Sequence, residues 1–326
     1  MTEERFLVTG SSGCIGSWVI KLLGEAGIPV VGADIDPEPR RLAQLVPPES
    51  LPSVSFVKLD ITDLDGVLRT LEGRRVNRVI HLAALQIPFC RADPARGALV
   101  NVVGTVNIFE AARRLGVRSL VYASSVAVFG PPNFYRDAAP LPDDAPQWPE
   151  TLYGVYKQTN EGTARLYWQD YGVPSVGLRP WAVYGVGRDQ GLTSDPTKAI
   201  KAAVLGMPFK IRFGGRLDLQ YAEDVARIFI AAARRSVAGA PVFNIRGNVL
   251  SVEEFLAELA GVLPESRGLI GWEGPPLPLP PELDDRGLRE FLGGQVPHTP
   301  LAEGIRQTAE TFRALEAAGR LDPRID

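Results

Sequence analysis

A glycine-rich turn between an apolar strand and an amphipathic helix constrains the fold of this chain more than any other feature. Residues 6–8 have strand character, and residues 15–26 carry apolar side chains at helical spacing. Between them, Gly10, Gly13 and Gly16 allow a tight turn and a close approach of another backbone. The helix would then present free N–H groups to a pyrophosphate, so the segment predicts dinucleotide binding, with a purely structural turn as the alternative.

The alternation of strands and helices continues along the chain and predicts a parallel sheet. Further strands are expected at 30–33, 54–59, 79–82, 119–123, 173–178 and 241–245, and helices at 64–71, 95–115, 151–171, 196–205, 222–235, 252–263 and 301–318. This pattern indicates an α/β fold, a Rossmann-type doubly wound parallel sheet with a smaller C-terminal α/β lobe. We expect residues 1–178, with 218–246 returning, to form the NAD-binding domain, and 179–217 with 247–326 to form the substrate-binding lobe. The proline-rich residues 131–149 are expected to form a surface loop.

An acidic residue at the end of the second strand favours NAD over NADP. The carboxylate of Asp34 can accept hydrogen bonds from both ribose hydroxyls and would repel a 2′-phosphate. Arg40 and Arg41 follow closely and leave NADP open. Asp60 ends the third strand, where it can contact the adenine amino group, and its alternative role is to cap the next helix.

A tyrosine and a lysine four residues apart, Tyr153 and Lys157, fall on one face of a predicted helix. A free tyrosine has a pKa of about 10 and is a poor base at neutral pH. An adjacent ammonium group and the positive nicotinamide of NAD both favour the phenolate, which suits general acid–base catalysis. The pair is short enough to occur by chance, in which case both residues are simply exposed.

Four further segments carry a resemblance to a known family. They are 81–84 (HLAA), 101–105 (NVVGT), 124–130 (SSVAVFG) and 178–185 (LRPWAVYG). With the glycine turn and the tyrosine–lysine pair, nearly the whole chain resembles the extended short-chain dehydrogenases/reductases of the NAD-dependent epimerase/dehydratase family. The resemblance implies an NAD-dependent oxidoreductase with a catalytic set made of Asn101, Ser125, Tyr153 and Lys157.

The resemblance also implies further contacts and an oligomeric state. Asn101 would kink its helix and hold a water of a proton relay, whereas His81 would be structural or line the cofactor, with a catalytic base as the alternative. The two long helices, 95–115 and 151–171, would form a homodimer interface. The expected cofactor contacts are Gly10, Gly13, Cys14, Ile15, Gly16, Asp34, Asp60, Ile61, Leu82, Ala83, Ala84, Tyr153, Lys157 and Pro180.

The substrate region departs from that of nucleotide-sugar enzymes. Ala182 replaces an asparagine that contacts the diphosphate in those relatives, and Leu217 replaces a phosphate-binding arginine, with Arg216 one place early. A small sugar, polyol or sugar acid is therefore expected, bound by Ser125, Arg188, Thr193 and Gln220. An NDP-sugar 4-epimerase with tightly bound NAD and a non-catalytic NAD-sensing regulator remain as alternatives.

Composition narrows the possible partners. The net charge of −3 provides no basic surface for nucleic acid. No apolar run approaches the roughly 18 residues of a membrane span. The acidic start does not resemble a signal peptide, and the two cysteines, Cys14 and Cys90, form neither a disulfide framework nor a metal motif. We expect a cytoplasmic protein without a metal.

Overall fold

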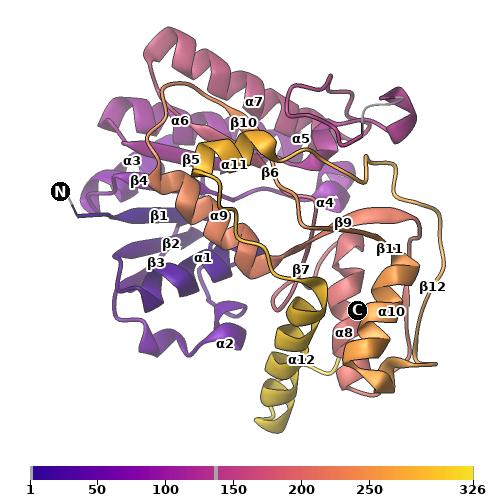
Figure 1. Cartoon of the computed structure of the whole chain (residues 1–326). Helices are drawn as coiled ribbons and strands as arrows, with labels where there is room; N and C mark the ends of the chain where they lie inside the picture. Colours follow the sequence, from indigo (N-terminus) through magenta and orange to yellow (C-terminus); the bar gives the residue numbers. More distant parts are fainter. Residues whose placement is uncertain (1–2, 136–138, 326) are drawn as a thin grey trace.

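A seven-stranded parallel sheet forms the centre of the molecule (Figure 1). Its neighbouring strands all run in the same direction. Across the sheet the order is β10 (Val242–Asn244), β6 (Val176–Arg179), β5 (Ser119–Ala123), β4 (Arg78–His81), β1 (Phe6–Thr9), β2 (Val30–Asp34) and β3 (Val54–Lys58). The strand order reverses between β1 and β4, the position where open α/β sheets bind ligands. The predicted Rossmann-type fold is confirmed.

The computed structural model describes residues 3–135 and 139–325. Residues 136–138, which belong to the loop predicted over 131–149, lie outside this description.

Alternate side chains of the strands enter two separate cores, because successive residues of a strand point to opposite faces. Phe6 and Val8 of β1 pack in one core, and Leu7 between them packs in the other. Helices α1 (Cys14–Glu25) and α9 (Ala222–Arg234) cover the first face, with α2 (Leu42–Leu45) beside α1. The second face is covered by α3 (Leu64–Gly73), α6 (Gly104–Leu115) and α7 (Leu152–Tyr171). Burial of both faces explains why the strands read as nearly continuous apolar runs.

The long helix predicted over 95–115 is interrupted. The structure shows α5 (Pro94–Ala98), then a π-helical turn at Leu99–Val103, and then α6, with the short α4 (Ile87–Ala92) before them. Asn101 lies inside this π-helical turn, so the helix departs from regular α-helical geometry at the residue for which a kink was predicted. The π-turn carries one residue more per turn than an α-helix, a feature that is frequent at functional sites.

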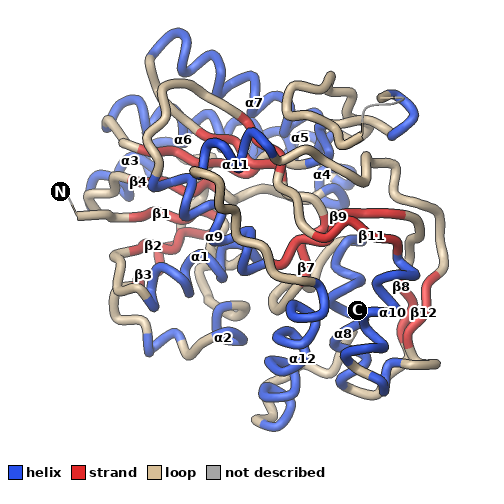
Figure 2. Tube along the Cα trace, viewed as in Figure 1, coloured by secondary structure: helices blue, strands red, loops and turns tan. Residues whose placement is uncertain are grey.

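A second, smaller lobe follows the sixth strand (Figure 2). It contains a three-stranded sheet, β11 (Asn248–Ser251), β9 (Arg216–Tyr221) and β7 (Ala182–Tyr184), and a two-stranded sheet, β12 (Ile270–Trp272) and β8 (Phe209–Ile211). Its helices are α8 (Asp195–Val204), α10 (Val252–Val262) and α12 (Leu301–Ala317). The helices were predicted, whereas the five short strands were not.

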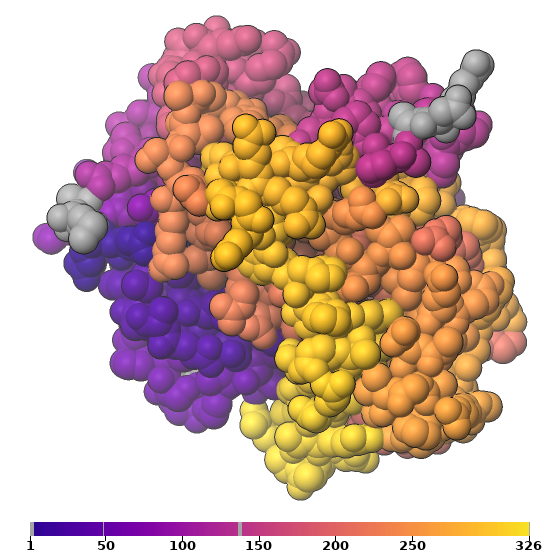
Figure 3. Space-filling model, in the orientation of Figure 1, coloured from indigo at the N-terminus to yellow at the C-terminus, as the bar shows by residue number. Residues whose placement is uncertain are grey.

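The chain crosses between the two parts more than once. β10 pairs with β6 at the edge of the central sheet, α9 packs on α1, and α11 (Arg286–Leu292) packs beside β10. In the space-filling view the C-terminal residues lie between the N-terminal part and residues of the second lobe (Figure 3). Among the described residues, no helix has both the length and the apolar character needed to cross a bilayer.

Candidate active site

The glycine turn closes tightly around the start of α1. Gly10 has a φ of 69°, and a Cβ at this position would lie 2.7 Å from the backbone nitrogen of Ala83. A Cβ at Gly16 would collide with the carbonyl oxygen of Gly10. Gly13 is the N-cap residue of α1 and provides no side-chain cap, and no acidic residue occupies the first turn. The first N–H groups of α1 are therefore left for an anion, which fits the pyrophosphate of a dinucleotide.

The predicted adenosine contacts lie at the ends of β2 and β3. Asp34 Oδ2 accepts a hydrogen bond of 3.0 Å from the backbone nitrogen of Ser12. Asp60 Oδ1 accepts hydrogen bonds from the backbone nitrogen and the hydroxyl of Thr62, at 2.9 and 2.8 Å. The N-cap residue of α3 is Asp63 and not Asp60, so the alternative capping role of Asp60 is wrong.

The remaining predicted cofactor contacts line the same edge of the sheet. Ile61 is buried against Gly104, which begins α6. Partly buried backbone follows β4 and is expected to face the cofactor, at Leu82, Ala83 and Ala84. Pro180 is buried directly after β6. Cys14 and Ile15 open α1, and burial raises the pKa of the Cys14 thiol to about 12, so this thiol is protonated at neutral pH.

His81 is fixed inside the protein. Its Nδ1 lies 2.7 Å from Thr9 Oγ1, and its Nε2 lies 3.1 Å from Thr105 Oγ1. Burial, aided by the charge of Lys157, lowers the pKa of His81 to about 3. The imidazole is thus neutral at pH 7 with both nitrogens engaged, which argues against the alternative of a catalytic base.

Asn101 is fully buried, and its amide is used by the neighbouring backbone. Its Nδ2 donates to the carbonyl oxygen of Leu85 at 2.8 Å, and its Oδ1 accepts from the nitrogen of Leu85 at 2.7 Å. The π-helical turn therefore holds the segment after β4 in place. A water relay through Asn101 stays a prediction.

The other three predicted catalytic residues come together at the carboxyl ends of the strands. Tyr153 and Lys157 lie in the first two turns of α7, which begins after the N-cap residue Thr151. Ser125 follows β5, and its hydroxyl is close enough to Tyr153 to favour the lower pKa of that phenol. Lys157 Nζ lies 5.6 Å from the centroid of the Tyr153 ring and donates to the carbonyl oxygen of Ala123 at 2.7 Å.

The electrostatics of this cluster differ from the expectation. Burial raises the pKa of the Tyr153 phenol, and this effect outweighs the hydrogen bond from Ser125 and the charge of Arg188, which both lower it. Burial also lowers the pKa of Lys157 to about 8, against the opposing effects of Cys90 and Glu161. The lysine by itself does not make Tyr153 a phenolate, because desolvation penalises the charged forms of both groups.

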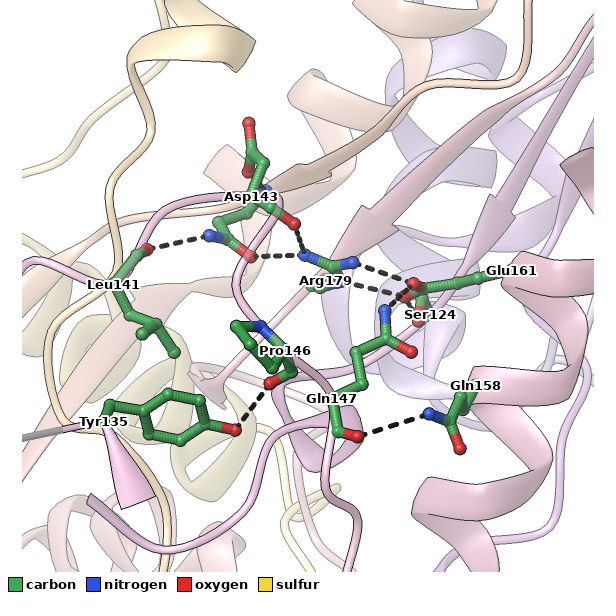
Figure 4. A network of polar contacts seen from close by, with 10 residues as sticks. Ser124, Tyr135, Leu141, Asp143, Pro146, Gln147, Gln158, Glu161 and Arg179 are labelled. Atoms are coloured by element: carbon green, nitrogen blue, oxygen red, sulfur yellow. Dashed lines mark hydrogen bonds and ion pairs between the residues drawn. The ribbon is translucent and has the colours of Figure 1, made fainter. Parts of the chain in front are cut away.

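A buried ion pair joins α7 to the end of β6 (Figure 4). Arg179, at the end of β6, donates to both carboxylate oxygens of Glu161, at 2.8 and 2.7 Å, and the two side chains are 3% and 7% exposed. Glu161 is one helical turn after Lys157 and also accepts from Ser124 and Gln147.

The same arginine joins two further segments to the site. Arg179 Nη1 donates to the carbonyl oxygen of Asp143 at 2.8 Å and to Asn244 Oδ1 at 3.1 Å. The Asp143 carboxylate accepts from the backbone nitrogen of Asn244, and burial raises the pKa of Asp143 to about 6. The proline-rich loop and β10 are thereby fixed to the helix that carries Tyr153.

The predicted substrate residues separate into two groups. Arg188 Nη2 donates to Thr193 Oγ1 at 2.9 Å, whereas its Nε is buried without a hydrogen-bond partner. Gln220 is different, since its Oε1 accepts from the nitrogen of Trp181 and its Nε2 donates to Asp218 and to the carbonyl oxygen of Ile245. The prediction that Gln220 meets sugar hydroxyls is therefore wrong, because its polar atoms are already bound within the lobe.

Arg216 does not replace the missing phosphate-binding arginine. It is exposed and lies next to Glu254 and the carbonyl oxygen of Val249, outside the buried face that holds Leu217. The buried Asp218 accepts a hydrogen bond from the nitrogen of Gly247. The shifted arginine thus belongs to the surface of the lobe.

Sequence reasoning missed two polar contacts of the site. One is the Glu161–Arg179 pair, and the other is an ion pair between Arg41 and Asp189, residues 148 positions apart. Glu161 is four residues after Lys157, and this spacing was a signal that it faces the same side of α7. No local pattern links Arg41 to Asp189.

A Rossmann-type sheet, an uncapped helix after a glycine turn and a serine–tyrosine–lysine cluster together define an NAD-dependent enzyme of the extended short-chain dehydrogenase type. The family model described as "NAD dependent epimerase/dehydratase family" matches residues 6–245. The chain belongs to this family and uses NAD.

Individual relatives support the same assignment. A UDP-glucose 4-epimerase of Mycolicibacterium smegmatis is 35% identical over 325 residues, covering 95% of this chain and 98% of the relative. The crystal structure of Thermus thermophilus UDP-glucose 4-epimerase in complex with NAD is 28% identical, with a TM-score of 0.79, and covers 95% and 99% of the two chains. A partial consensus L-threonine 3-dehydrogenase shares the fold, with a TM-score of 0.82, 24% identity and coverage of 95% and 99%.

Proposed function

We propose that this enzyme oxidises or reduces the C–OH/C=O group of a small sugar, polyol or sugar acid by hydride transfer to or from NAD. The observation that carries the proposal is the meeting of Ser125, Tyr153 and Lys157 at the carboxyl edge of the parallel sheet, the edge at which the glycine turn also follows its strand. Each of the three side chains has a different role in the proposed reaction.

Tyr153 is the proposed general acid–base. In its phenolate form Tyr153 takes the proton of the substrate hydroxyl, while the Ser125 hydroxyl donates a hydrogen bond to the same substrate oxygen. Lys157 places a positive charge beneath the tyrosine ring and is itself fixed by the carbonyl oxygen of Ala123. NAD, when bound, accepts the hydride from carbon and adds the positive charge that favours the phenolate.

Arg188 favours an acidic sugar over a neutral one. Its guanidinium is close enough to Tyr153 to lower the pKa of that phenol, and its buried Nε lacks a partner. A buried donor without a partner costs free energy, so a substrate carboxylate there would satisfy it. Thr193, already bonded to Arg188, is placed to orient it. The absence of the two nucleotide-sugar contacts at Ala182 and Leu217 separately favours a substrate without a nucleotide.

The second candidate is an NDP-sugar 4-epimerase, which the similarity to the UDP-glucose 4-epimerases favours. It would use the same three side chains but return the hydride to the other face of the keto intermediate, so NAD would not be consumed. A non-catalytic NAD-sensing regulator is the candidate of another class. It has no need of the buried serine–tyrosine–lysine cluster.

One experiment separates the three. Purified protein is incubated with NAD and with free sugars, sugar acids or UDP-sugars, and both NADH formation and product configuration are followed. Net NADH with a sugar acid supports the proposal, an inverted UDP-sugar without net NADH supports the epimerase, and no turnover of any substrate supports the regulator. Tyr153→Phe should abolish turnover. Tyr156→Phe is the matched control, because Tyr156 instead donates to the carbonyl oxygen of Pro94.

A homodimer is part of the proposal. Apolar side chains on the π-helical turn and α7 are 40–48% exposed, namely Leu99, Val103, Leu152, Val155 and Leu166. A second copy of the chain would cover these apolar side chains. Leu166→Glu should shift the molar mass in light scattering to that of a monomer, and Met207→Glu, at an exposed site on the second lobe, should not.

The cytoplasmic location remains a proposal as well. It is supported by the two unpaired cysteines, Cys14 and Cys90.

A further inference from the structure

Arg41, one of the two arginines because of which the sequence did not exclude NADP, forms an ion pair with Asp189 of the second lobe. Arg41 Nε lies 3.1 and 3.0 Å from the two carboxylate oxygens of Asp189, and its Nη2 lies 2.7 Å from Oδ1. Arg41 Nη1 donates to the carbonyl oxygen of Ser12 at 2.7 Å. This two-pronged geometry is the strong form of an arginine–carboxylate pair.

This ion pair lies next to the glycine turn and the end of β2, where the adenosine part of NAD is expected. Ser12 in the glycine turn bonds to Asp34 through its nitrogen and to Arg41 through its oxygen. Burial lowers the pKa of the Arg41 guanidinium, but the hydrogen bond and charge of Asp189 outweigh burial and raise it, with a smaller contribution from the charge of Asp34. The carboxylate of Asp34, which is expected to bind the ribose hydroxyls, therefore lies close to the guanidinium of Arg41, because both are bonded to Ser12.

The pair is partly protected from water. Arg41 is 21% exposed and Asp189 52%, and the side chain of Arg41 packs on Gly187, where a Cβ would lie 3.6 Å from it. The segment before Asp189 is fixed to α1, because Trp18 Nε1 donates to the carbonyl oxygen of Val186 at 3.0 Å. This contact between α1 and residue 186 therefore fixes the segment that carries Asp189.

The neighbouring arginine is occupied as well. Arg40 bonds to Glu38 at 2.7 Å and lies 3.7 Å from Asp36, so both arginines after β2 have acidic partners. An enzyme that accepts NADP needs a cation near the ribose to bind the 2′-phosphate. Here the guanidinium of Arg41, the cation next to Asp34, is neutralised by Asp189 of the second lobe.

We propose that Asp189 is a cofactor-specificity residue, which selects NAD by binding Arg41 and keeping its guanidinium from a 2′-phosphate. Asp34 then repels the 2′-phosphate of NADP, and Asp189 prevents the Arg41 guanidinium from donating hydrogen bonds to that phosphate. This goes beyond the proposed function, because it concerns the choice between two dinucleotides whatever the substrate is.

The test uses two fragments that differ by the group in question, 5′-AMP and 2′,5′-ADP, with binding to the full chain measured by calorimetry. For Asp189→Ala we expect 2′,5′-ADP to bind about tenfold tighter, the gain of roughly one charge-assisted hydrogen bond, with 5′-AMP nearly unchanged. The double variant Asp189→Ala/Arg41→Ala should lose this gain. The ratio of NADP to NAD affinity should change in the same order.

The control is Glu265→Ala, which changes the net charge equally by removing the exposed partner of Arg313 far along the chain. An equal gain in this variant would overturn the proposal, because the effect would then be one of net charge. An equal gain in the Asp189→Ala/Arg41→Ala variant would overturn it as well, because the gain would then not depend on the Arg41 guanidinium. Unchanged 2′,5′-ADP binding in Asp189→Ala would overturn it too. Thermal unfolding of each variant verifies that it is folded, and Asp189→Asn, which preserves the shape of the side chain, provides the same comparison if the alanine variant is not.

Discussion

Replacing Arg179 with methionine should leave the buried carboxylate of Glu161 without its positively charged partner. Arg179→Met deletes both hydrogen bonds to Glu161, those of 2.8 and 2.7 Å, as well as the donors to Asp143 and Asn244, while the methionine side chain retains much of the volume. Breaking a buried pair by removing one partner costs about 3–5 kcal/mol, because the other charge stays out of water. For a chain of 326 residues, the entropy of unfolding is roughly 0.7 kcal/mol/K, so the melting temperature should fall by about 4–7 °C.

Two comparisons make this prediction specific. Arg113→Met removes an arginine that binds Glu110 on the surface of α6, with side chains 39% and 17% exposed. Such a pair contributes at most about 1 kcal/mol, so this variant should shift the melting temperature by less than about 2 °C. Arg179→Met/Glu161→Met should recover part of the loss, because no charge is left unpaired.

The measurement is thermal unfolding followed by calorimetry or circular dichroism, supported by urea unfolding of the same variants. Equal shifts for Arg179→Met and Arg113→Met would refute the reasoning. So would a double variant less stable than Arg179→Met alone, since the cost would then come from lost packing and not from the stranded charge of Glu161.

Three further predictions concern the site. Tyr153→Phe should lower kcat by about 100-fold or more while NAD still binds, as turnover and a fluorescence titration would show; loss of NAD binding would contradict a purely chemical role. Lys157 has a folded pKa of about 8, below its ordinary 10.5, so the unfolded state binds more protons between these values and the stability should rise from about pH 8 to pH 10.5. Urea unfolding should show the free energy of unfolding of the wild type rising relative to that of Lys157→Met over this range. A constant difference between the two would contradict the shifted pKa. Arg188→Met should raise KM for sugar acids about tenfold or more and leave neutral polyols nearly unaffected in initial-rate measurements, whereas equal effects on both would argue against a carboxylate contact.

The sequence predicted the central sheet well because its signals are local. Strands buried on both faces read as apolar runs, and the glycine turn, Tyr153 and Lys157 are recognisable from short spacings. Four of the five strands of the second lobe were missed because they have only three or four residues, and the apolar–polar alternation of the fifth, β9, was not recognised. β9 is buried along Leu217–Tyr221, so the polar Gln220 looked available to a substrate although its amide is consumed inside the lobe. Contacts between distant segments, such as Arg41 with Asp189, depend on how the two lobes meet.

The π-helical turn at Asn101 holds one residue more than an α-helical turn would. Deleting Asn101 would let the segment Leu99–Val103 close into a regular α-helix, so α6 would keep its orientation, with Thr105 facing His81 and Ile108 in its core. The loss would fall on the segment after β4, because the backbone nitrogen and the carbonyl oxygen of Leu85 would both lose the amide that binds them. The extra residue therefore serves the neighbouring loop and not the packing of the helix that contains it.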